Sequence, residues 1–161
     1  MILKQDDVKK KLISIEEQLR TSGIDCVELF FGSQCKNVDP FEITERLKGD
    51  FDHNIVLGCG SNDYQALIGI GLSKSDTNAM GELEKDDDIL DAFGEFENNY
   101  AGMLMDNEAF TGAFGILTQS IAQYSAQNVF YPKAWSCSGY LSLEENCKIY
   151  LGFAIRKLIV F

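Results

Sequence analysis

Apolar residues in the first third of the chain recur at spacings that predict helices and one short strand. Over residues 5–22 they fall three or four positions apart with charged residues between them, as on one face of an amphipathic helix. Gly23 follows as a helix stop, and residues 26–31 are an apolar run that favours a strand. Residues 39–47 begin with an aspartate and a proline, which favours a second helix. The apolar stripe of the first helix is formed by Val8, Leu12, Ile15 and Leu19.

Two pairs of apolar, β-rich runs are each joined by a short polar turn. The first pair is 54–59 with 64–72, and the second is 135–143 with 148–155. Short turns between such runs predict two antiparallel hairpins. Helices and hairpins in this order, without a strand–helix–strand rhythm, predict an α+β layer fold in which an antiparallel sheet packs against long helices. No low-complexity linker divides residues 1–161, so we expect a single domain.

Two further helices are expected between the hairpins. A short one covers 75–83 with Ser75 as its cap, and a longer one begins in the acidic run 84–88, where negative charge complements the helix dipole. Set at about 100° per residue, residues 89–104 separate into two stripes. One stripe is apolar and is expected to pack; the other is polar and is expected to be presented. The apolar stripe comprises Ile89, Phe93, Phe96, Tyr100 and Met103, and the polar one Asp91, Glu95, Asn98 and Gly102.

Composition argues against several classes of function. Of 161 residues, 14 are Lys or Arg and 25 are Asp or Glu, so the formal net charge is −11. This charge repels phosphate backbones and anionic lipids, which makes nucleic acid and membrane poor partners. The chain has no C-x-x-C pair and one histidine, His53, so we expect neither a zinc site nor a histidine-based nucleophile. Five cysteines, an odd number, favour reduced core thiols, and early charges argue against a secretory signal, so we expect a cytoplasmic protein.

The polar stripe of the longer helix carries a combination suited to phosphoryl chemistry. Glu95 and Asn98 lie one turn apart. A carboxylate can hold a partner's cation, and a carboxamide can accept a hydrogen bond from water while donating one to a phosphoryl oxygen. Such a pair would catalyse by positioning water. Bare E-x-x-N arises by chance in a chain this rich in Glu and Asn, but Asp91 four residues before the Glu and Gly94 directly before it make the combination informative.

The string 91–102 resembles the motif of the CheC, CheX and FliY chemotaxis phosphatases. That motif is Asp or Ser, three residues, Glu, two residues, Asn and a later Pro, and here it occurs once, as in the single-site CheX branch. The order of hairpin, short helix, long helix and hairpin is also typical of CheX-like domains, so the resemblance covers about residues 50–155. At the position of the family's proline this chain has Ile121.

The resemblance implies a function in two-component signalling. It implies a hydrolase that removes the aspartyl phosphate of a CheY-like response regulator, with Glu95 bound to the regulator's active-site lysine and Asn98 orienting the hydrolytic water. The partner's own Mg2+ would neutralise phosphoryl charge, so this chain would need no cofactor or metal ion of its own. The resemblance also implies a homodimer that pairs through its sheets, for which an exposed edge strand near the C-terminus would serve.

Other interpretations stay open at this point. One is a scaffold that binds a receiver domain without accelerating dephosphorylation, favoured by Ile121 and by the less similar first 50 residues. Another is a sensor of a small ligand, which rests on fold analogy alone. Glu97, on the Phe93 side of the helix, is expected to be a boundary residue without a catalytic role. The aspartates at 86–88 are expected to serve the helix dipole instead of a cation, and His53 to lie in a surface loop.

Overall fold

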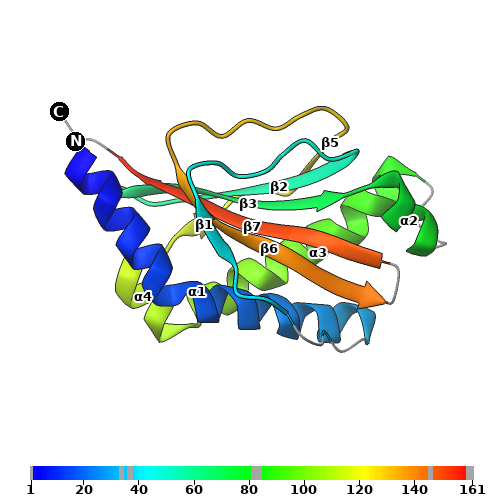
Figure 1. Cartoon of the computed structure of the whole chain (residues 1–161), viewed down its shortest axis with the longest axis horizontal. Helices are drawn as coiled ribbons and strands as arrows, with labels where there is room; N and C mark the ends of the chain where they lie inside the picture. The colour runs from blue at the N-terminus through cyan, green and yellow to red at the C-terminus, as the bar shows by residue number, and fades with distance from the viewer. Residues whose placement is uncertain (1, 33–34, 36–37, 81–84, 145–146, 159–161) are drawn as a thin grey trace.

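The protein is built from an antiparallel sheet with helices α1, α3 and α4 on one of its faces (Figure 1). The computed structural model describes residues 2–158 apart from 33–34, 36–37, 81–84 and 145–146. Within these residues the sheet has seven strands in the order β1-β6-β7-β3-β2-β4, and β5 also pairs with β2. The expected α+β layer fold is confirmed. The elements are α1 Ile2–Phe31, β1 Glu42–Thr44, β2 His53–Gly60, β3 Tyr64–Leu72, α2 Lys74–Met80, α3 Asp86–Met105, α4 Glu108–Phe114, β4 Thr118–Gln119, β5 Gln123–Ser125, β6 Trp135–Glu144 and β7 Cys147–Lys157.

Both predicted hairpins are confirmed and form the centre of the sheet. All of β2 pairs with β3, from His53 opposite Leu72 to Gly60 opposite Gln65. Their turn is closed by Ser61, whose backbone N–H donates to the Tyr64 carbonyl oxygen at 2.9 Å. β6 pairs with β7 in the same antiparallel manner, and β7 also pairs with β3. The two hairpins therefore merge into one continuous four-stranded centre.

The first helix is longer than predicted, and the expected strand over 26–31 is wrong. α1 runs through Gly23, which is buried so close to the sheet that an added Cβ would lie 2.8 Å from Leu151 Cδ2. The glycine thus allows close packing of helix on sheet and is no helix stop. The helix ends instead before Gly32, which has a φ of +63° and donates its N–H to the Glu28 carbonyl oxygen at 3.1 Å.

The expected helix over 39–47 is also wrong, because this segment supplies an edge strand. β1 pairs with β6, with Ile43 opposite Cys137. The strand is fastened to α1 where the Phe41 N–H donates to Glu16 Oε2 at 3.0 Å, and Gly139 on β6 leaves the space that the Phe41 ring fills. Pairing and ring burial outweigh the helix-start signal of the Asp-Pro sequence.

The short helix α2 lies at one end of the sheet, against β7 (Figure 1). Its cap is Ser73 and not the expected Ser75. The Asp76 N–H donates to Ser73 Oγ at 3.1 Å, and the Ser73 N–H donates back to Asp76 Oδ2 at 3.3 Å, which is a reciprocal capping box. The helix ends at Met80, whereas the expected end at 83 lies outside the described residues.

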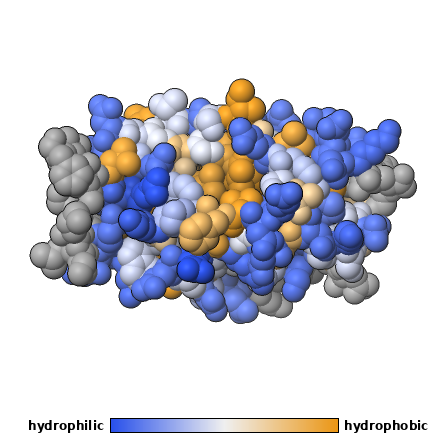
Figure 2. Space-filling model, turned by 90° about the horizontal axis from the view of Figure 1, so that it is seen from above, coloured by the Kyte–Doolittle hydropathy of each residue, from blue (hydrophilic) through white to orange (hydrophobic). Residues whose placement is uncertain are grey.

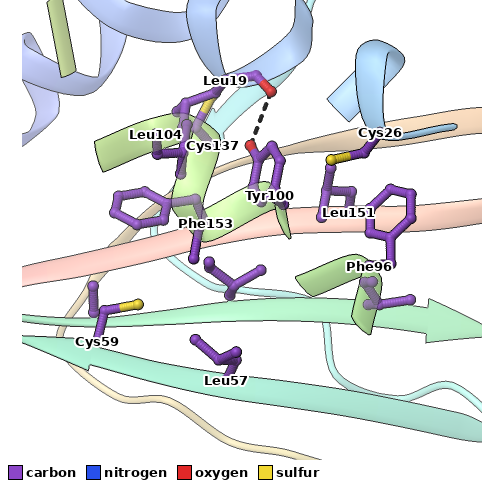
Figure 3. Close-up of a cluster of buried hydrophobic side chains, with 14 of the residues drawn as sticks. Leu19, Cys26, Leu57, Cys59, Phe96, Tyr100, Leu104, Cys137, Leu151 and Phe153 are labelled. Carbon is purple, nitrogen blue, oxygen red and sulfur yellow. Dashed lines mark hydrogen bonds between the residues drawn. The ribbon is translucent and has the colours of Figure 1, made fainter. Parts of the chain in front are cut away.

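The main core fills the space between the sheet and the two long helices, and Figure 3 shows its centre. Phe96 and Tyr100 of α3 lie beside Leu151 of β7, Leu57 lies further along the same core on β2, and all four are buried. The Tyr100 hydroxyl donates to the Leu19 carbonyl oxygen at 2.8 Å and so joins α3 to α1. This packing fixes which side of α3 faces the sheet.

The other face of the sheet is covered by the segments 45–52 and 126–134, which are held together by a 2.8 Å hydrogen bond from the Val129 N–H to the Gly49 carbonyl oxygen. A second, smaller apolar cluster lies beneath them. Figure 2 shows the molecule from this side, with hydrophobic side chains gathered near its middle among hydrophilic ones. The buried members of the cluster are Leu47, Ala134, Tyr150 and Ala154.

Candidate functional site on helix α3

The polar stripe of α3 is presented as predicted. Asp91, Glu95 and Gly102 are exposed and Asn98 is half-buried, whereas the opposite face of the helix is buried in the core. Gly102 has no atom of another residue near the place of a side chain, so the surface beside Asn98 is open. The helix starts with three aspartates in its first turn, where their charge complements the helix dipole. One helix therefore packs with one face and displays the other.

Glu95 has a free carboxylate. Its backbone carbonyl oxygen accepts a 3.0 Å hydrogen bond from Asn99 Nδ2, so the Asn99 side chain folds back on its own helix. Among the residues that the structure describes, the side chain of Glu95 makes neither a hydrogen bond nor an ion pair. An exposed, unpaired carboxylate is available to a cation of a partner.

Among the described residues, Asn98 has one hydrogen-bond partner, Gln119 on β4. Gln119 Nε2 donates to Asn98 Oδ1 at 3.4 Å. The bond uses one acceptor position of the carboxamide and leaves a second acceptor position and both amide hydrogens. Asn98 can therefore still bind water and a phosphoryl oxygen. Sequence reasoning did not single out Gln119, because only the pairing of β4 with β2 brings it beside α3.

The segment 118–125 follows the edge of the sheet beside α3 and contains a bulge. Between paired residues it spans four steps, from Gln119 to Gln123, against three steps on β2, from Cys59 to Val56. The extra residue lies in the stretch that includes Ile121, which is 83% exposed. The chain thus bends past α3 with isoleucine at the position of the family's proline, and both Glu95 and Asn98 keep their places on the helix.

Glu97 departs from expectation, because it is fully buried and not at the boundary of the apolar stripe. Neither oxygen of its carboxyl group has a hydrogen-bond partner among the described residues. Burial raises the pKa of Glu97 well above its usual value, because the charged form would lose its water in the core. The neutral acid is therefore the form that fits the core behind Asn98.

His53 also differs from the surface-loop expectation. It is the first residue of β2 and is half-buried, and its Nδ1 lies 2.6 Å from the Tyr124 hydroxyl oxygen on β5. Burial, together with a hydrogen bond to Asp86, raises the pKa of Tyr124 to about 12. Tyr124 thus links β5 to the first residue of β2.

The described residues show no arrangement of three or more His, Cys, Asp or Glu side chains that could hold a metal ion. The aspartates 86–88 follow one another in the first turn of α3. All five cysteines are free; four of them are buried and Cys35 is half-buried. In the described part of the chain no helix is both long and apolar enough to cross a bilayer.

Comparison with known proteins identifies the class of fold. Neither a protein-family model nor a curated protein matches the sequence. Solved structures of chemotaxis proteins do match. A putative chemotaxis protein from Desulfovibrio vulgaris Hildenborough has a TM-score of 0.69 at 15% identity, over 88% of this chain and 96% of its own. The chemotaxis protein CheX from Desulfovibrio desulfuricans has a TM-score of 0.66 at 15% identity, over 88% of this chain and 99% of its own.

A third match is the CheX chain solved in a complex with CheY, BeF3 and Mg2+ from Borrelia burgdorferi. It has a TM-score of 0.50 at 14% identity, over 87% of this chain and 96% of its own. At these identities the likeness concerns the fold. The chain has a CheX-like fold, as the resemblance of its motif implied.

Proposed function

We propose that this protein is a cytoplasmic phosphatase that hydrolyses the aspartyl phosphate of a CheY-like response regulator. In this proposal Glu95 binds the regulator's active-site lysine and Asn98 orients the hydrolytic water. The observation that carries it is the joint presentation of an unpaired carboxylate and a carboxamide on one exposed face of α3, within a CheX-like fold.

The chemistry proposed for Asn98 is the placement of a water molecule. The water oxygen forms a bond to phosphorus while the bond from phosphorus to the aspartyl carboxylate oxygen breaks. The carboxylate leaves with the electron pair, a water proton passes to the phosphate or to solvent, and inorganic phosphate is released. Asn98 Oδ1 would accept from the water and Nδ2 would donate to a phosphoryl oxygen. Positioning of this kind lowers the barrier by about 2 to 4 kcal/mol, or about 30- to 1,000-fold in rate.

The role proposed for Glu95 is recognition. A free carboxylate one helical turn from Asn98 would pair with the regulator's lysine and set the distance between Asn98 and the phosphoryl group. The Borrelia burgdorferi relative was solved bound to CheY with BeF3 and Mg2+, which supports a receiver as partner for a fold of this kind. Mg2+ of the partner would supply charge neutralisation, so the proposal gives this chain no metal ion.

The test is the decay of a phosphorylated CheY-like receiver from the same genome in magnesium buffer, with and without this protein. We expect a decay rate that rises with protein concentration to a plateau. Saturable binding of the phosphorylated receiver without any change in phosphate lifetime would contradict the proposal and establish the non-catalytic scaffold instead.

We also propose that the protein is a homodimer. The expected edge near the C-terminus is supplied in part by β6, because β1 pairs only with its residues Ser136–Ser138. β7, by contrast, is paired on both sides. Sedimentation velocity at micromolar concentration should give the mass of two chains, and a monomer would contradict the proposal.

A further inference from the structure

We propose that Gln119 is a positioning residue that fixes the orientation of the Asn98 carboxamide, a role that rests on the proposed function. The observation behind it is the 3.4 Å hydrogen bond from Gln119 Nε2 to Asn98 Oδ1. It joins two elements that are 21 residues apart in the chain. Asn98 thus has a partner from the sheet edge, whereas the Glu95 side chain has none in the part of the chain that the structure describes.

β4 is short, but its backbone is fixed by β2. Gln119 pairs with Cys59 and Thr118 pairs with Gly60. The next residue, Ser120, donates its N–H to the Gly58 carbonyl oxygen at 2.8 Å. Because directly paired residues of antiparallel strands share a face, Gln119 lies on the same face as Cys59, which is buried toward α3 beside Glu97. The side chain of Gln119 is therefore directed at the helix turn that carries Asn98.

Further contacts keep the segment 118–125 against α3. Gly94, one turn before Asn98, is so close to the segment that an added Cβ would lie 3.3 Å from Ala122 Cβ. At the other end, Tyr124 lies close enough to Asp86, at the start of the helix, for that carboxylate to contribute to its raised pKa. The bulge between Gln119 and Gln123 lets one strand edge meet the helix at all of these points. The backbone that carries Gln119 is therefore held by β2, and the residues that follow it pack against α3.

The hydrogen bond matters because the two ends of a carboxamide have the same shape but opposite chemistry. The terminal torsion of asparagine is broad and roughly two-fold, so a free side chain would present its oxygen and its amide nitrogen in turn to the same place. In the structure Gln119 Nε2 is the donor, so the Asn98 carboxamide has Oδ1 on the β4 side and Nδ2 pointing away from it. Only one orientation can accept from the water and donate to the phosphoryl oxygen at their fixed places.

Three single substitutions test whether Gln119 orients Asn98 or only contributes to the structure of β4. Gln119→Ala removes the donor, and we expect the maximal rate of receiver dephosphorylation to fall about three- to tenfold, as for loss of one hydrogen bond, with the half-saturating concentration unchanged. Gln119→Glu keeps the length but offers only acceptors, so it would turn Nδ2 of Asn98 toward β4 and lower the maximal rate further. Thr118→Ala, on the same strand, is the matched control and should leave both constants unchanged.

A double-substitution cycle tests whether Gln119 acts through Asn98. In an Asn98→Ala background, Gln119→Ala should have no further effect on the rate. An equal loss in both backgrounds would overturn the proposal, because Gln119 would then act independently of Asn98.

The contact also has a readout that needs no activity. In ¹⁵N-labelled protein, the side-chain amide signal of Asn98 is assigned by its loss in Asn98→Ala. We expect Gln119→Ala to increase the picosecond-to-nanosecond motion of this amide and Gln119→Glu to shift its resonances in a different direction. If motion and shift are unchanged in both variants, the positioning role is overturned. Should the wild-type protein fail to accelerate decay, the proposed function falls, and this spectrum still decides whether Gln119 holds Asn98.

Discussion

The two faces of α3 differ in burial and in the partners of their side chains. On the buried face Phe93, Phe96 and Tyr100 fill the space above the sheet, and the Tyr100 hydroxyl has a partner on α1. On the presented face the carboxylate of Glu95 has no partner within the described residues. The buried face therefore determines the stability and position of the helix, whereas the presented face is free for chemistry. Substitutions on the two faces should separate folding from activity.

The largest expected effect is on stability, from Phe96→Ala on the buried face. Phe96 is fully buried and lies 5.9 Å from Phe30 and 6.4 Å from Phe93 between ring centroids. Its truncation leaves a cavity and should lower the free energy of unfolding by about 3 to 5 kcal/mol. Urea denaturation followed by circular dichroism measures this change. A loss below about 1 kcal/mol would contradict the packing of this face.

The second effect is a pH dependence of stability, which arises because Glu97 places a carboxyl group on the buried face of α3. Its folded-state pKa is raised, so the folded protein keeps the proton while the unfolded chain loses it above the ordinary value of 4.5. Between these two pKa values the stability falls by about 1.4 kcal/mol per pH unit as pH rises. Glu97→Gln stays neutral and removes this loss.

The variant Glu97→Gln should therefore resemble the wild type near pH 4 and become increasingly more stable than it as pH rises. Urea unfolding at several pH values gives the difference, and Glu17→Gln, at an exposed position of α1, is the control with no such trend. A stability difference that stays constant between pH 4 and 8 would show that Glu97 is not held as the neutral acid.

A smaller effect is expected from Glu95→Gln on the presented face. The change removes the charge that would pair with the regulator's lysine but keeps the size of the side chain. We expect about a tenfold higher half-saturating concentration in receiver dephosphorylation, with the difference shrinking as salt is raised. The free energy of unfolding should not change, because the carboxylate has no partner among the residues that the structure describes. A tenfold change that is independent of salt would argue against charge pairing.

The parts of the fold that follow from local pattern were predictable. The hairpin of β2 and β3 has apolar strands on either side of a short polar turn, and the two stripes of α3 appear at helical spacing. Glu95 and Asn98 could be proposed as a candidate pair because Asp91, Gly94 and the pair itself lie within one helix. The exposure of Glu95 and the half-burial of Asn98 agree with that prediction of a presented face.

The errors arose where distant contacts decide the conformation. In the second half of α1 the helical stripe continues through Cys26, Val27 and Phe30 while Leu29 is 63% exposed, a pattern hidden by the apparent stop at Gly23. That glycine is explained only by its closeness to Leu151 on β7.

Two residues near the site had no local signal. Gln119 reaches Asn98 only because β4 pairs with β2, far away in the sequence. Glu97 is buried because of the way α3 is turned about its own axis against the sheet. Glutamate is seldom fully buried, so its residue type gave no hint of this position.

If Asn98 positions the hydrolytic water, Asn98→Ala and Asn99→Ala should differ sharply in activity. The two asparagines are neighbours on α3, but the Asn99 side chain folds back onto the Glu95 carbonyl oxygen. The measurement is the decay rate of a phosphorylated CheY-like receiver at saturating concentrations of each variant. We predict that Asn98→Ala loses about 30-fold or more of the acceleration while still binding the receiver, and that Asn99→Ala keeps it. Equal activity of the two variants would contradict the claim.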